Sequence, residues 1–462
     1  MRTSSFVAPM IACVALLRRF SYAWPSCSPC SPHLYGPYNF RQVSATEEAT
    51  TPRGFRSSLT SARPLFLASA ALAIIFSAFA LLQYVDDTAT AYNGRVNTRG
   101  DFAFLLGSGR LITSEHRGLL YEPSPAGANA WPREHGYMFP SWFPYPPAVA
   151  LGTALFHPFD LDTSLDIWRF LIAVSAFTLG ACVASAFKSW PWRIAMIVAV
   201  FLWFPLLMNV RIGQTGAFVA AATALFTLAY LRKREAGAML LGLLCLKPTA
   251  AIGPALIVLQ ERPAIWLRFA ITGAAVVILP FALLGPGAFF DWLEVLRGRT
   301  WIDIGGGHSY NQGLSSLIGA STAAGLAIAA VLCLIAAGLV HLVQIKLGLH
   351  AAMAFAILGG SLVNPHSLFY DWGTAFVAIM LLRMSDLIPQ SQADKSDLLF
   401  GLLGLSLFFC GQFAWDARHE EGQYLRPLTA WTLLVAGALF LLTIRRFTEP
   451  EEPSHLLSAE AT

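Results

Sequence analysis

The chain has 462 residues, of which 56% are apolar and 13% are charged, and its formal net charge is +4. About a quarter of the residues in an ordinary soluble protein are charged, so this composition and the mean hydropathy of +0.57 exclude a soluble globular chain. Repeated apolar runs of roughly 18 to 25 residues predict an all-α polytopic membrane protein with about ten or more transmembrane helices. The small positive charge fits cytoplasmic loops, so we expect membrane lipid and no nucleic acid as a partner.

Residues 1–62 are rich in Ser, Pro, Thr and Arg and are predicted to form a disordered cytoplasmic tail. Cys27 and Cys30 form a CxxC pair in this tail, but no second pair accompanies them, so neither a redox nor a metal site is expected. The first predicted span covers residues 65–85. Basic residues in front of it place the N-terminus in the cytoplasm and the following loop outside: Arg53, Arg56 and Arg63.

A multi-spanning domain is predicted over residues 63–447, with an outer loop at 86–143 and a cytoplasmic tail at 448–462. Residues 144–158 are apolar but short and broken by prolines, which indicates a re-entrant or surface-lying piece. Further spans are predicted near residues 165–187, 191–208, 213–231, 264–285, 319–343, 350–363, 367–384, 397–414 and 427–445.

The segment 236–259 is long enough to cross, yet Lys247 and Pro248 interrupt its middle. A plain crossing would invert the sidedness of every later span, whereas a hairpin that enters from the cytoplasm and returns keeps the basic loops inside. We therefore predict a helical hairpin with Lys247 at its tip. Polar groups then gather on the outer side: Asp101, the corner 209–214, the loop 286–312, residues 364–366, and Tyr370 with Asp371.

The outer loop is the longest polar interval, and it contains one carboxylate at the head of an amphipathic run. Asp101 precedes a predicted helical face made of Phe102, Leu105, Leu106 and Gly109. A carboxylate in this position can act as a general base, which contributes about 10² to 10⁴ in rate. The alternative is a helix N-cap, a position for which aspartate is well suited.

Lys247 is expected to be functional, because a lysine at mid-bilayer costs about 3 kcal/mol. The phosphate of a lipid-linked substrate would be its counter-charge, and snorkelling or pairing with a carbonyl is the alternative. Arg211 can hold a phosphate with its planar fork of donors, or it is an interfacial arginine. Gln214 binds sugar or phosphate, or caps the next helix. His366 orients an acceptor, or it is an interfacial histidine.

Several short motifs occur in an order and spacing that resemble a known family. In and after the outer loop these are Asp101-Phe102, Gly109-Arg110, Leu120-Tyr121 and Tyr145-Pro146-Pro147; further along they are Gly213-Gln214, Lys247-Pro248, Asn311-Gln312 and NPHSLFYDW from Asn364. The pattern is similar to glycosyltransferase family 87, the polytopic mannosyltransferase-like proteins of the C-type superfamily. The resemblance extends from about residue 65 to residue 445.

This resemblance implies a C-type glycosyltransferase fold with an outer catalytic loop. It implies inverting transfer of a hexose, often mannose, from a polyprenyl-phosphate donor to a glycolipid or glycan acceptor on the extracytoplasmic side of the cell membrane. Asp101 would be the base, and Lys247 and Arg211 would hold the donor phosphate. The remaining expected substrate-binding residues are Gln214, Tyr145, Asn311 and His366. No metal ligand set and no cofactor are expected.

Two other classes of function remain as alternatives. One is a transporter or flippase of a polyprenyl-linked or other amphiphilic substrate. Transporters often contain paired broken helices in repeated halves, whereas this sequence has one broken segment without a clear counterpart. The other alternative is a membrane scaffold without catalytic activity.

Overall fold

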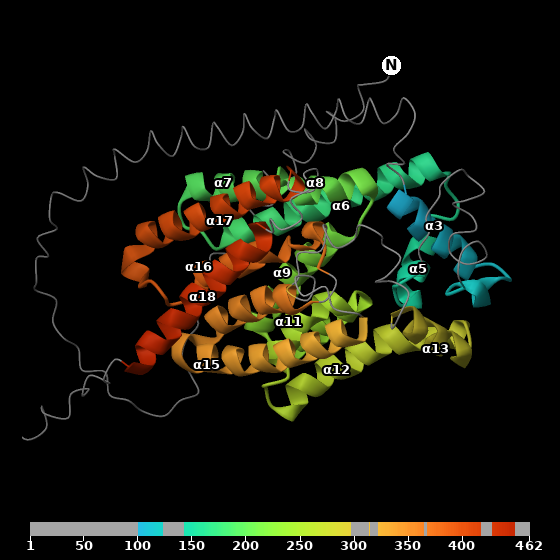
Figure 1. Cartoon of the computed structure of the whole chain (residues 1–462). Coiled ribbons are helices and arrows are strands. Elements are labelled where there is room, and N and C mark those ends of the chain that lie inside the picture. Colours follow the sequence, from blue (N-terminus) through green and yellow to red (C-terminus); the bar gives the residue numbers. More distant parts are fainter. Residues whose placement is uncertain are drawn as a thin grey trace, which may run out of the picture. The chain divides into compact units, whose positions relative to one another are not determined.

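The chain divides into two units, Met1–Arg63 and Pro64–Thr462. The computed structural model describes residues 100–122, 143–296, 314, 322–364, 367–416 and 427–448, all in the second unit. These residues are helical and contain no strand, as the all-α prediction requires (Figure 1). The longer helices are α6 (Leu161–Ser185), α9 (Gly216–Arg232), α12 (Pro263–Ile278), α15 (Thr322–Val363), α17 (Ala393–Asp416) and α18 (Pro427–Thr448). The shorter ones are α3 (Gly100–Ile112), α5 (Pro147–Ala154), α7 (Trp190–Phe201), α8 (Phe204–Ile212), α10 (Arg234–Gly242), α11 (Pro248–Val258), α13 (Pro286–Glu294) and α16 (Thr374–Met384).

Four segments of the described chain are long and apolar enough to cross a membrane: Leu161–Ser185, Pro263–Leu283, Ala330–Val363 and Leu428–Arg446. A bent pair, α7 with α8, makes a fifth if it counts as one span. The described part therefore has fewer candidates than the expected ten or more. The reason is length, since α11 and α16 have 11 residues each and a crossing needs about 20. The first expected span, 65–85, lies outside the described residues.

One predicted span differs from expectation at a backbone break. Residues 191–208 were expected as one helix, but α7 and α8 are bent by 40° relative to each other. Pro205 lies in the first turn of α8, where its missing N–H costs no helical hydrogen bond. The separate spans expected at 319–343 and 350–363 correspond to the two parts of α15, which are divided at Gly348 by a non-helical backbone with a φ of 81° and a ψ of 175°.

The expected hairpin is present and consists of α10, the short 3₁₀ helix η2 (Leu243–Leu246) and α11, with Lys247 at the turn. Its two ends meet, because Glu261 accepts a 2.8 Å hydrogen bond from Tyr230 Oη and pairs with Arg234 at 3.3 Å. The hairpin thus begins and ends on the same side of the helical domain. Since α11 is roughly 17 Å long, the hairpin reaches only part of the way through a hydrocarbon layer of about 30 Å.

Helix α16 lies at the centre of the described bundle, in contact with α6, α9, α15 and α17 (Figure 1). Every residue from position 374 to position 383 is buried. A helix that is apolar all round can face lipid or protein, and the sequence does not distinguish the two cases. The contacts of α16 show that protein surrounds it.

Helix α3 is more enclosed than its predicted amphipathic pattern implies. The expected face is buried, but Phe104 on another side is also only 4% exposed and its ring lies 5.7 Å from that of Phe143. Helices α5, α6 and α8 all contact α3. One close approach is at Gly109, where a Cβ would lie 2.6 Å from the backbone of Ala154. The helix that carries Asp101 is therefore held rigidly.

Candidate active site

A left-handed turn after α8 brings Gln214 against the start of α3. Gly213 ends α8 with a φ of 74°, a conformation that favours glycine. A Cβ at Gly213 would lie 2.4 Å from the Cβ of Phe102, so a side chain there would displace α3. Because Phe102 directly follows Asp101, this glycine contact sets the distance between Gln214 and the carboxylate.

Asp101 and Gln214 form the first half of the site. Gln214 Nε2 donates a hydrogen bond of 2.9 Å to Asp101 Oδ2. Burial raises the pKa of Asp101 from 3.8 to about 6, and the Gln214 hydrogen bond opposes part of this rise. The carboxyl is therefore mostly ionised at neutral pH, yet it is a stronger base than an exposed aspartate.

Lys247 and Asp371 form the second half. Lys247 Nζ donates a short hydrogen bond to Asp371 Oδ1, and the two side chains are only 12% and 11% exposed. The lysine projects from the hairpin tip, and Asp371 lies in the 3₁₀ helix η6 (Phe369–Asp371) before α16. Burial of the pair makes each partner depend on the other, since an uncompensated charge in this environment is costly.

Asn209 connects the two halves through the backbone. It is fully buried, and its Oδ1 accepts the N–H of Gly216 at 2.8 Å, next to Gln214. Its Nδ2 donates to the carbonyl of Tyr370 at 3.3 Å, next to Asp371. One amide thus fixes both the turn that carries Gln214 and the turn that carries Asp371.

Two tyrosines complete the cluster. Burial raises the pKa of Tyr145, which interacts electrostatically with Lys247, Asp371 and Asp101. Burial also raises the pKa of Tyr370 well above its usual value, with Asp101 and Asp371 as further causes. Both phenols therefore stay protonated and can donate hydrogen bonds. The shared interactions join Asp101 and the Lys247–Asp371 pair into one site.

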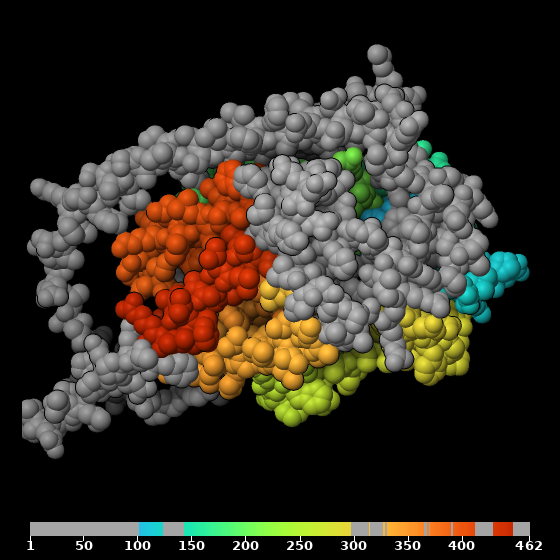
Figure 2. All heavy atoms as spheres, in the orientation of Figure 1, coloured from blue at the N-terminus to red at the C-terminus, as the bar shows by residue number. Residues whose placement is uncertain are grey.

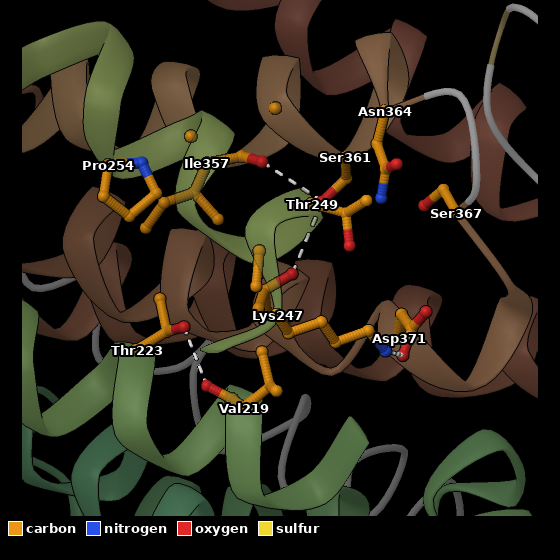
Figure 3. Close-up of a pocket in the computed structure, with 14 residues that line it drawn as sticks. Val219, Thr223, Lys247, Thr249, Pro254, Ile357, Ser361, Asn364, Ser367 and Asp371 are labelled. Atoms are coloured by element: carbon orange, nitrogen blue, oxygen red, sulfur yellow. Dashed lines mark hydrogen bonds and ion pairs between the residues drawn. The ribbon is translucent and has the colours of Figure 1, made fainter. Parts of the chain in front are cut away.

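A polar cavity adjoins the Lys247–Asp371 pair. It measures about 30 Å³, which is room for roughly two water molecules. Figure 3 shows the Lys247 side chain extending to Asp371, with Asn364 and Ser367 on the same side. Among the described residues, Asp371 Oδ2 is buried without a hydrogen-bond partner. The cavity is thus lined by hydroxyl, amide and carboxylate groups of a kind that bind polyols.

The structure brings together four of the residues selected from sequence: Asp101, Gln214, Lys247 and Tyr145. Arg211 lies nearby in the last turn of α8, three residues before Gln214. His366 and Asn311 lie outside the described residues. Sequence reasoning placed Asp371 at this end but did not select it. Asp371 could have been identified from the sequence, because a buried lysine such as Lys247 needs an anionic partner.

The described residues contain no group of three or more His, Cys, Asp or Glu side chains able to hold a metal ion. The polar groups of the site are instead a carboxylate beside an amide and an ammonium group beside a carboxylate. Such a set can remove a proton and bind an anion or hydroxyl groups. It matches the requirements of a group transfer to a hydroxyl.

Comparison with known proteins supports this chemistry. Residues 142–365 match the family model of glycosyltransferase family 87. Over this region the chain is similar to a family of glycosyltransferases. The matched region contains Tyr145, Gln214 and Lys247, whereas Asp101 and Asp371 lie outside it. No curated protein and no solved structure matched the chain.

The match confirms the family and the class of enzyme that the sequence motifs predicted. It does not favour the transporter alternative. The apolar helices indicate that the chain is a membrane protein.

Proposed function

We propose that the chain transfers a hexose, with mannose as the first candidate, from a polyprenyl-phosphate donor to a glycolipid or glycan acceptor. Transfer proceeds with inversion on the extracytoplasmic side of the cell membrane, within a C-type glycosyltransferase fold. The observation that carries the proposal is the half-buried Asp101 carboxylate, held by Gln214 and electrostatically linked to the Lys247–Asp371 pair through Tyr145. The family match supplies the reaction class.

In the proposed reaction, Asp101 removes the proton from the acceptor hydroxyl as its oxygen attacks the anomeric carbon. The new carbon–oxygen bond forms on the face opposite the bond to the donor phosphate, which breaks, so the configuration inverts. Gln214 holds Oδ2 of the carboxylate and leaves Oδ1 for the proton. This general-base step contributes about 10² to 10⁴ in rate.

The leaving polyprenyl phosphate keeps the electron pair and gains negative charge. Lys247 stabilises this charge, and Arg211 on the neighbouring corner provides a second cation. Asp371 holds the ammonium group in place before the donor binds, and its Oδ2 accepts a hydrogen bond from a sugar hydroxyl. Tyr145 donates from its phenol to the phosphate or the sugar. Asn311 and His366 would complete the donor and acceptor sites.

The test is a transfer assay with purified protein in nanodiscs, radiolabelled polyprenyl-phosphate mannose and a lipid extract as the acceptor pool. Asp101→Asn keeps the shape and the hydrogen bond from Gln214 but removes the base, so product formation should fall at least about 100-fold. Asp291→Asn, which alters an exposed carboxyl in α13, is the matched control and should leave transfer unchanged. Full activity of the Asp101→Asn protein would exclude Asp101 as the base.

A further inference from the structure

A second charged cluster lies at the base of the hairpin, at the other end from Lys247. It surrounds an open hollow of about 480 Å³ between the start of α10 and the start of α12. Four basic side chains belong to it: Lys233, Arg234, Arg262 and Arg268. Two carboxylates, Glu235 and Glu261, accompany them, so the cluster has an excess of two positive charges.

The ion pairs of this cluster leave guanidinium groups available at its surface. Glu235 is shared by two arginines, with Arg262 Nη2 at 3.2 Å and Arg268 Nη2 at 2.8 Å. These arginine side chains are 68% and 46% exposed. A guanidinium group has five N–H donors, and one shared carboxylate cannot accept them all. An added anion such as a phosphodiester would bind between them with charge-assisted hydrogen bonds.

The position of Arg268 indicates that this anion carries a hydrocarbon chain. The residue lies in the second turn of α12, which begins the membrane-span candidate Pro263–Leu283. Leu267 and Ile271 are 42% and 65% exposed beside it, and Ile278 continues the same stripe at 53%. Their spacing places them on one helical face together with Arg268. Helix α12 lies at the lower edge of the face seen in Figure 2.

We propose that this cluster, defined by Lys233, Arg234, Arg262 and Arg268, is a binding site for the headgroup of an anionic phospholipid. The phosphate lies between Arg262 and Arg268, and an acyl chain follows the apolar stripe of α12. The charge complementarity and the continuous apolar face together select a lipid over a free anion. The site is separate from the transfer chemistry, and it holds the two ends of the hairpin whose tip carries Lys247.

The experiment uses the full-length protein, stripped of lipid in neutral detergent. Phosphatidylglycerol, phosphatidylcholine with the same acyl chains, or inorganic phosphate is added, and bound lipid is measured by native mass spectrometry beside the melting temperature. Wild-type protein should prefer phosphatidylglycerol to phosphatidylcholine and should not respond to inorganic phosphate. In R262Q/R268Q the preference should fall about tenfold or more.

The matched control is R445Q/R446Q, which removes two exposed arginines at the end of another span candidate, Leu428–Arg446. It should keep the preference for phosphatidylglycerol. An equal loss in both variants, an unchanged preference in R262Q/R268Q, or a full stabilising effect of inorganic phosphate would each overturn the proposal. If the double variant does not fold, R262Q alone is used for the same comparison, because its side chain is the more exposed.

Discussion

Asp101 combines two properties that an exposed carboxylate does not have together. Burial disfavours its charged form and raises its pKa to about 6, while Gln214 donates a hydrogen bond that favours the charged form. The folded state therefore binds this proton more tightly than the unfolded state does. The contribution of this carboxyl group to stability is full below about pH 4 and is lost as the pH rises through about 6. The proposed general-base step needs the ionised form, which is the less stable form in the fold.

The pH dependence of transfer follows from this balance. We expect kcat/KM to be constant above about pH 7 and to fall about tenfold per unit below pH 6, as Asp101 becomes protonated. Gln214→Leu removes the hydrogen bond that lowers the pKa, so the midpoint should move to a higher pH. The measurement is a pH–rate profile of both proteins. A midpoint in Gln214→Leu that is unchanged or lower would contradict the assignment.

Lys247 and Asp371 should show strong energetic coupling, because both are nearly buried. Lys247→Met and Asp371→Leu should each lower the free energy of unfolding by about 3 to 5 kcal/mol, whereas the double variant should recover at least about 2 kcal/mol of the summed loss. Chemical denaturation of the four proteins measures this coupling.

The control for this cycle is the pair Asp166–Arg169, which is 3.8 Å apart with one side chain 79% exposed. Its coupling should be below about 1 kcal/mol. Equal coupling in the two cycles would mean that the Lys247–Asp371 contact is no stronger than a surface ion pair.

At the scale of single elements, local sequence patterns predicted much of what is observed. The predicted span 165–187 corresponds to α6, and the predicted span 427–445 corresponds to α18. Hydropathy and length determine such segments directly. The break between α7 and α8, just before Pro205, was missed because a mean hydropathy contains no backbone geometry.

The pairing between elements was not predictable from one sequence. Asp101 and Gln214 are separated by 113 positions, and Lys247 and Asp371 by 124. No periodicity relates residues at such distances, because tertiary packing alone brings them together. The topology did place both Lys247 and Asp371 at one end of the domain, but it could not pair them. No sequence pattern predicts the contacts of Asn209 with the turn that carries Gln214 and the turn that carries Asp371.

The crossing of α11 and α15 fixes the depth of the hairpin tip. A Cβ at Gly360 would lie 2.5 Å from the backbone of Gly253, so an alanine there must push the two helices apart. We expect Gly360→Ala to lower the free energy of unfolding by about 1 to 3 kcal/mol and to reduce transfer, since α11 begins next to Lys247. Thermal unfolding and the transfer assay measure the two effects.

Gly338→Ala is the control on the same helix, because a Cβ there meets nothing within 4 Å. The better helix propensity of alanine should make this protein as stable as the wild type or up to about 1 kcal/mol more stable. Similar losses in both variants would show that the close contact with α11 is unimportant.

At the scale of the whole domain, the hairpin determines the sidedness of everything that follows it. The ion pair between Arg234 and Glu261 joins its two ends, and the electrostatic contact of Lys247 with Tyr145 places its tip in the candidate active site. A part-way hairpin would also bring a buried lysine to the proposed donor phosphate without a full crossing. The same segment read as one span would put Asp101 and Asp371 on opposite sides of the membrane.

Labelling with a membrane-impermeant thiol reagent tests this arrangement in a variant without the native cysteines. Ala236→Cys and Ala264→Cys flank the hairpin at exposed positions, and Gly118→Cys is exposed in the segment after α3. Ala236→Cys and Ala264→Cys should react from the same side, because the hairpin returns to its starting end. Gly118→Cys should react in intact cells, and the other two only after permeabilisation. Reaction of Ala236→Cys and Ala264→Cys from opposite sides would make the segment a crossing. If all three variants react from one side, the result would still support the hairpin. It would contradict the extracytoplasmic location of the proposed transfer.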